Sequence, residues 1–177
     1  GKGKRKEAAA SLANLSAAYP SWVREAIPAL QNCLESEPIR ARAPAADALA
    51  RIGLVYPDEV ISAEDAIVNM LNGDLNININ NALLFVISVR LERSRDQVEA
   101  LSTHSNQSVQ HVAKLALASI DGEVPRYGSY ILALQDIAGR KADPITGISH
   151  QDLVETRTVD ADLEKLLSIG KEEHLFN

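Results

Sequence analysis

The chain has 177 residues and a net charge of −6; its apolar content is ordinary, but alanine is abundant and aromatic residues make up only 4%. A chain of this length forms one ordinary domain or four to five short helical repeats, and its small side chains favour closely packed helices. The single cysteine, Cys33, excludes an intrachain disulfide and favours a reducing compartment, so we expect a cytoplasmic protein.

No segment approaches the ~18–20 apolar residues of a membrane-spanning helix, so we expect no membrane partner. The basic residues 2–6 have no apolar segment behind them and do not form a secretory signal. The sequence lacks an initiator methionine, and we interpret it as a fragment that begins in the first turn of a repeat. Acidic residues outnumber basic ones by 11 to 6 over residues 121–177, but only by 13 to 12 over residues 1–120. This distribution argues against an extensive basic surface that binds nucleic acid.

Residues 5–34 and 42–71 are two copies of one unit, offset by 37 positions. Tyrosine, proline, arginine and the large apolar residues fall on one another when the copies are aligned. The matches are Arg5 with Arg42, Ala8 with Ala45, Leu12 with Leu49, Leu15 with Ile52, Tyr19 with Tyr56, Pro20 with Pro57, Val23 with Val60 and Leu34 with Leu71. A period of this length is typical of solenoids built from helical repeats.

The first copy is predicted to form two helices. The first runs from Lys6 to Ala18 and ends before Pro20, because proline disfavours a helical conformation in the residue before it. Ser21 is expected to cap the second helix, and Pro28 to bend it. At helical spacing, the inward positions are Ala8, Ala9, Leu12, Leu15 and Ala18, then Trp22, Val23, Ala26, Ile27, Leu30, Cys33 and Leu34.

The second copy repeats this pattern after a loop at residues 35–38. Its first helix ends at Tyr56-Pro57, and Asp58 is expected to cap one continuous second helix that runs to Leu71. The inward positions are Ala45, Ala46, Leu49 and Ile52, then Val60, Ile61, Ile67, Val68 and Leu71.

Two looser units follow the turn at residues 72–74. Residues 76–81 alternate asparagine with isoleucine, and we interpret them as a loop that enters the next helix. A break at residues 93–95 precedes a short partner helix from Asp96 to Ser102, and Ser108 is expected to cap the first helix of the fourth unit. The inward positions are Ala82, Phe85, Val86 and Val89, then Val109, Val112, Ala113, Ala116, Leu117 and Ile120.

The repeat register is lost after Asp121-Gly122. A helix is predicted from Tyr130 to Ala138, as a candidate for the missing partner of the fourth unit, and a second one from Asp160 to Ile169. Residues 143–152 are rich in turn formers and are expected to be irregular. We therefore divide the chain into repeats over 1–121 and a C-terminal cap or flexible tail over 122–177.

The second copy is similar to the HEAT repeat, in its short, HEAT-like form. That family's recurring stretch is Val-Arg-x-x-Ala-Ala-x-Ala-Leu-Gly-x-Ile, and residues 41–52 read Ala-Arg-Ala-Pro-Ala-Ala-Asp-Ala-Leu-Ala-Arg-Ile. The fourth copy has Gln110 at the place of the arginine, and the third has Ile79 there. Over residues 4–121 the resemblance implies an all-α protein, a right-handed α-solenoid of about four HEAT-like helix pairs. It also implies that Arg5 and Arg42 tie one repeat to an acid or a carbonyl of its neighbour.

The chemically reactive side chains form no recognisable catalytic or metal site. His104 and His111 are seven residues apart, and His150 precedes Asp152 by two, which are not the spacings of a metal site. Cys33 lies on an apolar stripe and is expected to be a buried packing thiol. No glycine-rich phosphate loop is present. We expect a non-enzymatic protein without a cofactor.

The outward residues of the second helices form the candidate partner-binding surface. In the solenoids that the resemblance implies, these helices line a concave face on which extended partners lie. This surface is polar and mildly acidic, which suits a protein or extended peptide that carries basic groups. It consists of Arg24, Gln31, Asn32, Asp58, Glu59, Ser62, Asp65 and Asn69, with Glu25, Glu35 and Asn72 beside them.

Two alternatives to a protein-binding scaffold remain open. One is nucleic-acid binding through a basic cluster at the N-terminus, Lys2, Lys4, Arg5 and Lys6, together with Arg40, Arg42 and Arg51. The other is an accessory role like that of the phycobilin lyases, which some HEAT-like proteins resemble.

Overall fold

The computed structural model describes residues 2–18, 24–35 and 39–139, and these ranges contain helices and no strand. The longer helices are α1 (Lys2–Ala18), α3 (Ile27–Glu35), α4 (Arg42–Val55), α6 (Glu64–Leu71), α7 (Asn76–Val89), α8 (Arg95–Leu101), α9 (Gln107–Ile120) and α10 (Arg126–Gly139). Shorter pieces join them: η1 (Arg24–Ala26), η2 (Ile39–Ala41), α5 (Pro57–Val60), η3 (Ile61–Ala63) and η4 (Glu92–Ser94). The all-helical prediction is confirmed. The predictions for residues 19–23, residues 36–38 and the segment beyond residue 139 concern residues outside the described ranges.

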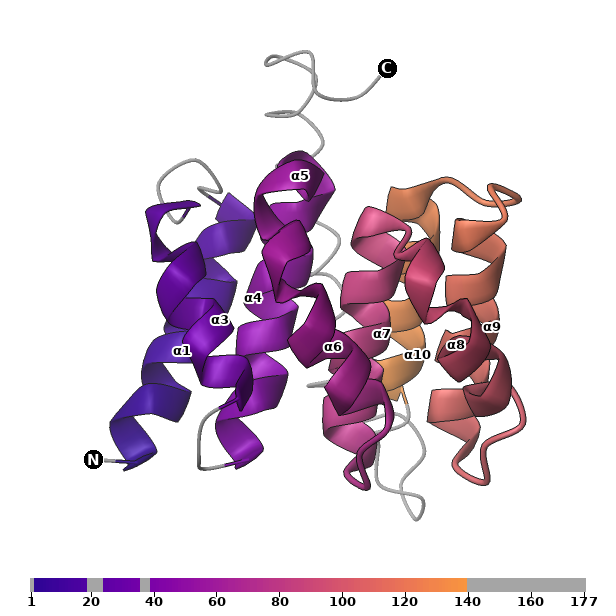
Figure 1. Cartoon of the computed structure of the whole chain (residues 1–177), viewed down its shortest axis with the longest axis horizontal. Coiled ribbons are helices and arrows are strands. Elements are labelled where there is room, and N and C mark those ends of the chain that lie inside the picture. Colours follow the sequence, from indigo (N-terminus) through magenta and orange to yellow (C-terminus); the bar gives the residue numbers. More distant parts are fainter. Residues whose placement is uncertain (1, 19–23, 36–38, 140–177) are drawn as a thin grey trace.

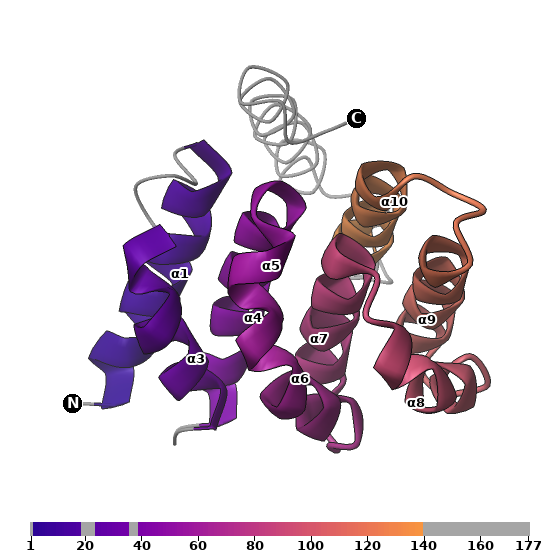
Figure 2. The same cartoon turned by 45° about the horizontal axis from the view of Figure 1, so that its top comes forward.

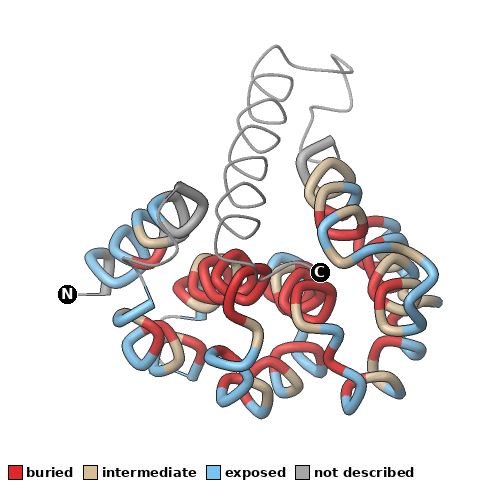
Figure 3. Tube along the Cα trace, turned by 90° about the horizontal axis from the view of Figure 1, so that it is seen from above, coloured by how far each residue is buried: buried red, intermediate tan, exposed pale blue. Residues whose placement is uncertain are grey.

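The helices form two layers (Figures 1 and 2). The first helices, α1, α4, α7 and α9, stand side by side in one row, and each packs against the next. The second helices, α3, α6 and α8, lie over that row and contact one another only lightly. Seen from above, α1 and α10 both rise on the side away from the second helices (Figure 3). The row of first helices therefore curves, and the second helices lie on the outer side of that curve. The prediction that they line a concave face is wrong.

The core is centred on α4, which is covered by α1, α3 and α7. Leu49 and Ile52 are fully buried there, as the repeat alignment predicts. The alanines of α4 are buried all round the helix, and their small size lets three neighbours approach it. At Gly53 the two helices α4 and α7 approach closely: a Cβ at this position would lie 2.9 Å from Val89 Cγ1 and 3.0 Å from Ser88 Oγ. The contact between α4 and α7 therefore requires glycine at this position.

The alternating stretch at residues 76–81 is the first part of α7, so the prediction of a loop there is wrong. Three of its asparagines find acceptors for their side-chain N–H groups, although the Oδ1 atoms of Asn78 and Asn80 are buried without a hydrogen-bond partner. Asn78 donates to the Ile39 carbonyl at 3.4 Å, Asn80 to Ser108 Oγ at 3.1 Å, and Asn81 to the Ile77 carbonyl one turn back at 2.8 Å. Burial of the rest of α7 then outweighs the weak helix propensity of asparagine.

Three expectations about helix starts are also wrong. Asn106, not Ser108, caps α9 by accepting the Val109 N–H at 3.1 Å, while Ser108 is buried against Asn80. Asp58 caps nothing, because Pro57 starts the short helix α5 and the chain then passes through η3 before α6 begins. Pro28 lies in the first turn of α3, where a missing N–H breaks no hydrogen bond and bends no helix.

Three side chains predicted to face inward are exposed: Ala8, Leu15 and Ile61. Leu15 is 48% exposed, whereas its equivalent in the second copy, Ile52, is buried. The difference follows from position: among the described helices α1 has α4 on one side and no first helix on the other. Ile61 is 43% exposed because it belongs to η3, whose tighter turn rotates it out of the stripe of α6. The remaining predicted core positions of α4, α7 and α9 are buried or half-buried.

The helix predicted over residues 130–138 exists as α10, which begins four residues earlier. It packs against α7 and α9, on the side of the row opposite α8 (Figure 3). It is therefore not placed as the second helix of a fourth pair. The turn between α9 and α10 contains Gly122 with φ 72°, and the Glu123 N–H reaches back to the Ala118 carbonyl at 2.9 Å. The boundary placed at residue 121 thus falls in a tight turn between two packed helices.

Candidate interaction surface

The eight residues singled out for partner binding lie together over η1, α3, α5, η3 and α6; we call them the second-helix surface. Arg24, Gln31 and Asn32 come from the first copy, and the other five from the second. The packing of α3 against α6 brings the two groups side by side. The elements that carry the predicted residues are therefore neighbours, and the residues themselves differ in whether they pair with one another.

Several members pair with each other across the seam between the two copies. Arg24 Nε lies 3.0 Å from Glu59 Oε2, and its guanidinium carbon is 5.0 Å from the centre of the Tyr56 ring. Gln31 Nε2 donates to Ser62 Oγ. Exposed pairs of this kind contribute about 0–1 kcal/mol each, so they orient the helices more than they stabilise them.

A second set of ion pairs ties α6 to the next unit through Arg93, whose guanidinium lies 2.6 Å from Glu64 Oε1 and 2.6 Å from Asp65 Oδ1. Hydrogen bonds to Glu64 first and to Asp65 second raise the pKa of Arg93. Asp65 and Glu59 are thus neutralised by neighbours rather than presented to a partner.

The acidic character of the surface rests on fewer carboxylates than the sequence suggests. Glu25, Glu35 and Asp58 are exposed, and no ion pair to them is found within the described residues. Asn32 and Asn69 are exposed as well. These side chains remain available to a ligand, and two of them, Glu35 and Asn69, lie at the seam between α3 and α6.

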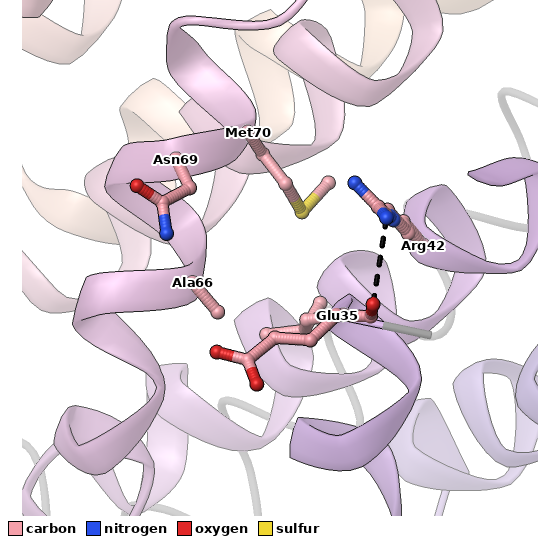
Figure 4. A pocket seen from close by; sticks show the side chains of 6 residues that line it. Glu35, Arg42, Ala66, Asn69 and Met70 are labelled. Atoms are coloured by element: carbon pink, nitrogen blue, oxygen red, sulfur yellow. Dashed lines mark hydrogen bonds between the residues drawn. The ribbon is translucent and has the colours of Figure 1, made fainter. Parts of the chain in front are cut away.

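A pocket of about 280 Å³ opens at this seam (Figure 4). It is lined by Leu34, Glu35, Arg42, Ala66, Asn69 and Met70. Arg42 Nη2 donates to the Glu35 backbone carbonyl at 3.4 Å, which matches the expected role of this arginine in tying one repeat to a carbonyl of its neighbour. Arg5, its equivalent in the first copy, is exposed.

A buried polar cluster that sequence reasoning missed joins α10 to the row. Arg51 Nε pairs with Asp47 Oδ1 at 3.1 Å within α4, and the Tyr130 hydroxyl of α10 donates to the same oxygen at 3.2 Å. Burial raises the pKa of Tyr130 well above its usual value of 10.0, and the Asp47 carboxylate raises it further. The Asp47–Arg51 spacing is visible in the sequence, but its partner 83 positions away is not.

A second contact from α10 lies beside this cluster. Arg126 Nη1 donates to the Ser88 carbonyl near the end of α7 at 2.9 Å. Burial lowers the pKa of Arg126, and the nearby Arg90 lowers it further. Together with the Tyr130 bond to α4, this bond orients α10 where it packs against α7 and α9.

The basic residues proposed for nucleic-acid binding do not form one surface. Lys4, Arg5 and Lys6 are exposed on α1, but Arg51 is only 9% exposed and paired with Asp47. Arg51 therefore offers no charge to a phosphate backbone.

The other reactive side chains have ordinary surroundings. Cys33 is half-buried rather than fully buried, His111 lies 3.4 Å from Asp136 at the surface, and His104 Nδ1 accepts the Asn106 N–H at 3.0 Å. Within the described residues no group of three or more His, Cys, Asp or Glu side chains is placed to hold a metal ion. None of the described helices combines the length and apolarity needed to cross a membrane. His150 and Asp152 lie outside the described residues.

Comparison of the chain with protein-family models, curated proteins and solved structures finds no match. The second-helix surface and the pocket beside it are therefore the features that indicate a function.

Proposed function

We propose that this protein is a non-enzymatic scaffold of the HEAT-like solenoid kind that binds a protein or an extended peptide carrying basic groups. The binding face in this proposal is the second-helix surface, on the outer side of the bend. Three kinds of support converge on it: the two-layer arrangement of helix pairs, the internal repeat, and the clustering of polar residues from two copies.

The observation that carries the proposal is the division of this surface into paired and unpaired side chains. Arg24–Glu59, Gln31–Ser62 and Asp65–Arg93 join neighbouring helices at the surface. The carboxylates of Glu25, Glu35 and Asp58 are exposed beside these pairs. A negatively charged patch accelerates and orients the approach of a basic partner and repels a phosphate backbone.

A selection from a displayed library of random peptides tests the proposal. We expect the wild-type protein to enrich peptides rich in lysine or arginine. Replacing both Glu25 and Asp58 by lysine should weaken those peptides about tenfold, because opposite charges become like charges. The effect should shrink as salt is raised from ~0.05 to ~0.5 M, because the screening length falls from more than 10 Å to a few Å.

The matched control replaces Glu7 in α1 and Glu123 in the turn before α10, both exposed and outside the second helices, by lysine. It makes the same change in net charge, so equal weakening by both variants would reduce the effect to net charge and contradict a defined surface. Retention of the wild type on duplex DNA, together with the absence of enriched peptides, would favour the nucleic-acid alternative instead.

A further inference from the structure

The pocket at the seam between α3 and α6 presents a negative and a positive charge at one small opening. Leu34 and Met70 are almost fully buried, so the surface that a ligand meets comes mainly from Glu35, Arg42 and Asn69. In Figure 4 the Glu35 carboxylate and the Asn69 amide lie at one side of the opening and the Arg42 guanidinium at the other, with the Met70 side chain between them. A ligand in the pocket therefore has groups of opposite charge on its two sides.

The two charged side chains come from consecutive helices of the chain. Glu35 is the last residue of α3, and its carboxylate is exposed, with no ion pair to a described residue. Arg42 is the first residue of α4 and donates from Nη2 to the Glu35 backbone carbonyl at 3.4 Å. A guanidinium carries five N–H donors in a fixed fork, so this bond holds the group at the pocket wall and uses only one of them.

Opposite charges on the two sides decide which class of ligand is favoured. A simple cation would be attracted by Glu35 and repelled by Arg42, and a simple anion would be repelled and attracted in the reverse sense. A molecule that has an ammonium group at one end and a carboxylate at the other is attracted at both ends. Its contacts would be charge-assisted hydrogen bonds, which are the strong kind, and a guanidinium fork matches the geometry of a carboxylate.

The volume of the pocket limits this dipolar ligand to a small molecule. A dry cavity of ~150 Å³ already holds a benzene molecule, so about 280 Å³ accommodates a free α-amino acid with a side chain of moderate length. In a free α-amino acid a single carbon atom joins the two charged groups, and both are ionised at neutral pH. The Asn69 amide offers both a donor and an acceptor to a polar side chain.

We propose that this pocket binds a free α-amino acid, whose ammonium group pairs with Glu35 and whose carboxylate pairs with Arg42. Asn69 hydrogen-bonds the polar side chain, and Met70 closes the pocket behind the ligand. This site goes beyond the proposed function, because it requires neither a protein partner nor the exposed carboxylates of Glu25 and Asp58.

The chain contains a single methionine, Met70, which makes the pocket directly observable. Protein labelled with ¹³C in the methionine methyl group should give a methyl signal in a carbon–proton NMR spectrum that disappears in Met70→Leu. The probe is L-serine, and its controls are L-serine amide, which lacks the carboxylate, and N-acetyl-L-serine, which lacks the ammonium group. We expect L-serine to shift the signal in a saturable manner below ~10 mM, and each control to bind at least about tenfold more weakly because one charge-assisted contact is lost.

Two variants test the two contacts separately. Glu35→Gln changes an exposed side chain and should reduce the preference for L-serine over N-acetyl-L-serine to less than about twofold. Arg42→Gln should reduce the preference for L-serine over L-serine amide to the same extent. Because Arg42 also joins α4 to the end of α3, the preference is compared between ligands within one variant, which does not depend on a change in stability. Ala100→Trp, at an exposed position of α8, is the control and should keep both preferences.

An unsaturated Met70 signal at ~10 mM L-serine, or equal binding of L-serine and its two controls, overturns the amino-acid site. The variant that carries lysine at positions 25 and 58 should bind L-serine within about twofold of wild type, because neither Glu25 nor Asp58 lines the pocket. If that variant weakens L-serine as much as Glu35→Gln does, net charge alone drives binding and the site is overturned.

The failures of the two proposals have different signatures. Saturable binding of L-serine, together with library peptides that bind the variant at positions 25 and 58 as well as wild type, supports the amino-acid site and contradicts the wider protein-binding surface. Library peptides that lose affinity in that variant, together with no response of Met70 to L-serine, support the wider surface and overturn the amino-acid site.

Discussion

At the scale of single residues, packing leaves no room for an additional atom at one helical glycine, in α4, and leaves room for it at another, in α10. Gly53 faces Val89, Ser88 and Val60, all within 3.0 Å of where a Cβ would stand. Gly128 in α10 has only Val124 Cγ1 at 3.6 Å, which is ordinary contact. Both glycines are inside helices, so the two positions differ in space rather than in local conformation.

Gly53→Ala should therefore destabilise the protein by about 1–3 kcal/mol, because the close contact of α4 with α7 has to open. Gly128→Ala should stabilise it by about 0.5–1 kcal/mol, because alanine has the better helix propensity and meets no clash. Urea unfolding followed by circular dichroism measures both. Equal shifts of the same sign would mean that α4 and α7 are farther apart than described.

Burial of leucine provides a second residue-scale prediction. Leu49 is fully buried in α4, and Leu15 is half-exposed in α1. Leu49→Ala should cost about 2–5 kcal/mol through lost burial and the cavity left behind, whereas Leu15→Ala should cost about 0.5 kcal/mol or less. The thermal midpoints of the two variants check this. A Leu49→Ala midpoint within about a degree of wild type would contradict the repeat register.

At the scale of elements, α10 is attached to the row by two part-buried hydrogen bonds, in addition to the exposed contact of Asp136 with His111 in α9. Tyr130 reaches Asp47 in α4, and Arg126 reaches the Ser88 carbonyl in α7. Because a buried hydrogen bond is directional, these contacts specify the angle at which α10 lies across the first helices, which apolar packing alone leaves loose.

The attachment of α10 should weaken in alkali. The pKa of Tyr130 is higher in the folded chain than in the unfolded chain, so its contribution to stability is complete below pH ~10 and is lost as the pH rises above it. There the unfolded state releases a proton that the folded state keeps, and the free energy of unfolding falls by up to about 1.4 kcal/mol per pH unit.

Unfolding in urea at several pH values between ~8 and ~11 measures this slope. Tyr130→Phe should remove the contribution of this residue to the fall of the free energy of unfolding with pH. At neutral pH it should lower the free energy of unfolding by about 0.5–1.5 kcal/mol, because the hydrogen bond to Asp47 is lost. Tyr127→Phe, at an exposed position of the same helix, is the control and should leave the slope unchanged. An unchanged slope in Tyr130→Phe would contradict a buried phenol.

At the scale of the whole molecule, stability should be graded from the middle of the row towards its edges. The helices α4 and α7 are buried on nearly every side, whereas α1 and α8 each expose a large part of their surface. Local opening costs least where few buried contacts are lost. Native-state hydrogen exchange should therefore be slowest in α4 and α7 and fastest in α1 and α8. Equal protection of α1 and α7 would show one cooperative unit without graded ends.

The sequence by itself determined the helical class and most of the core. The offset of 37 residues aligned Leu12 with Leu49 and Leu34 with Leu71, and helical spacing identified the buried positions of α4 and α9, because both patterns arise within one helix or one repeat. The same local reasoning predicted that the polar residues of the second-helix surface share one face. It also identified the arginine that donates to the Glu35 carbonyl.

Only the tertiary structure decided which of these groups pair and which remain free. Arg93 neutralises Asp65 from another unit, and Tyr130 contacts Asp47 across 83 positions, so no local pattern reveals either bond. The exposure of Leu15 depends on which helices stand beside α1, and the bend of the row decides which layer is outermost. The pocket at Met70 is likewise a property of the seam between two helices, because its walls come from residues that only packing brings together.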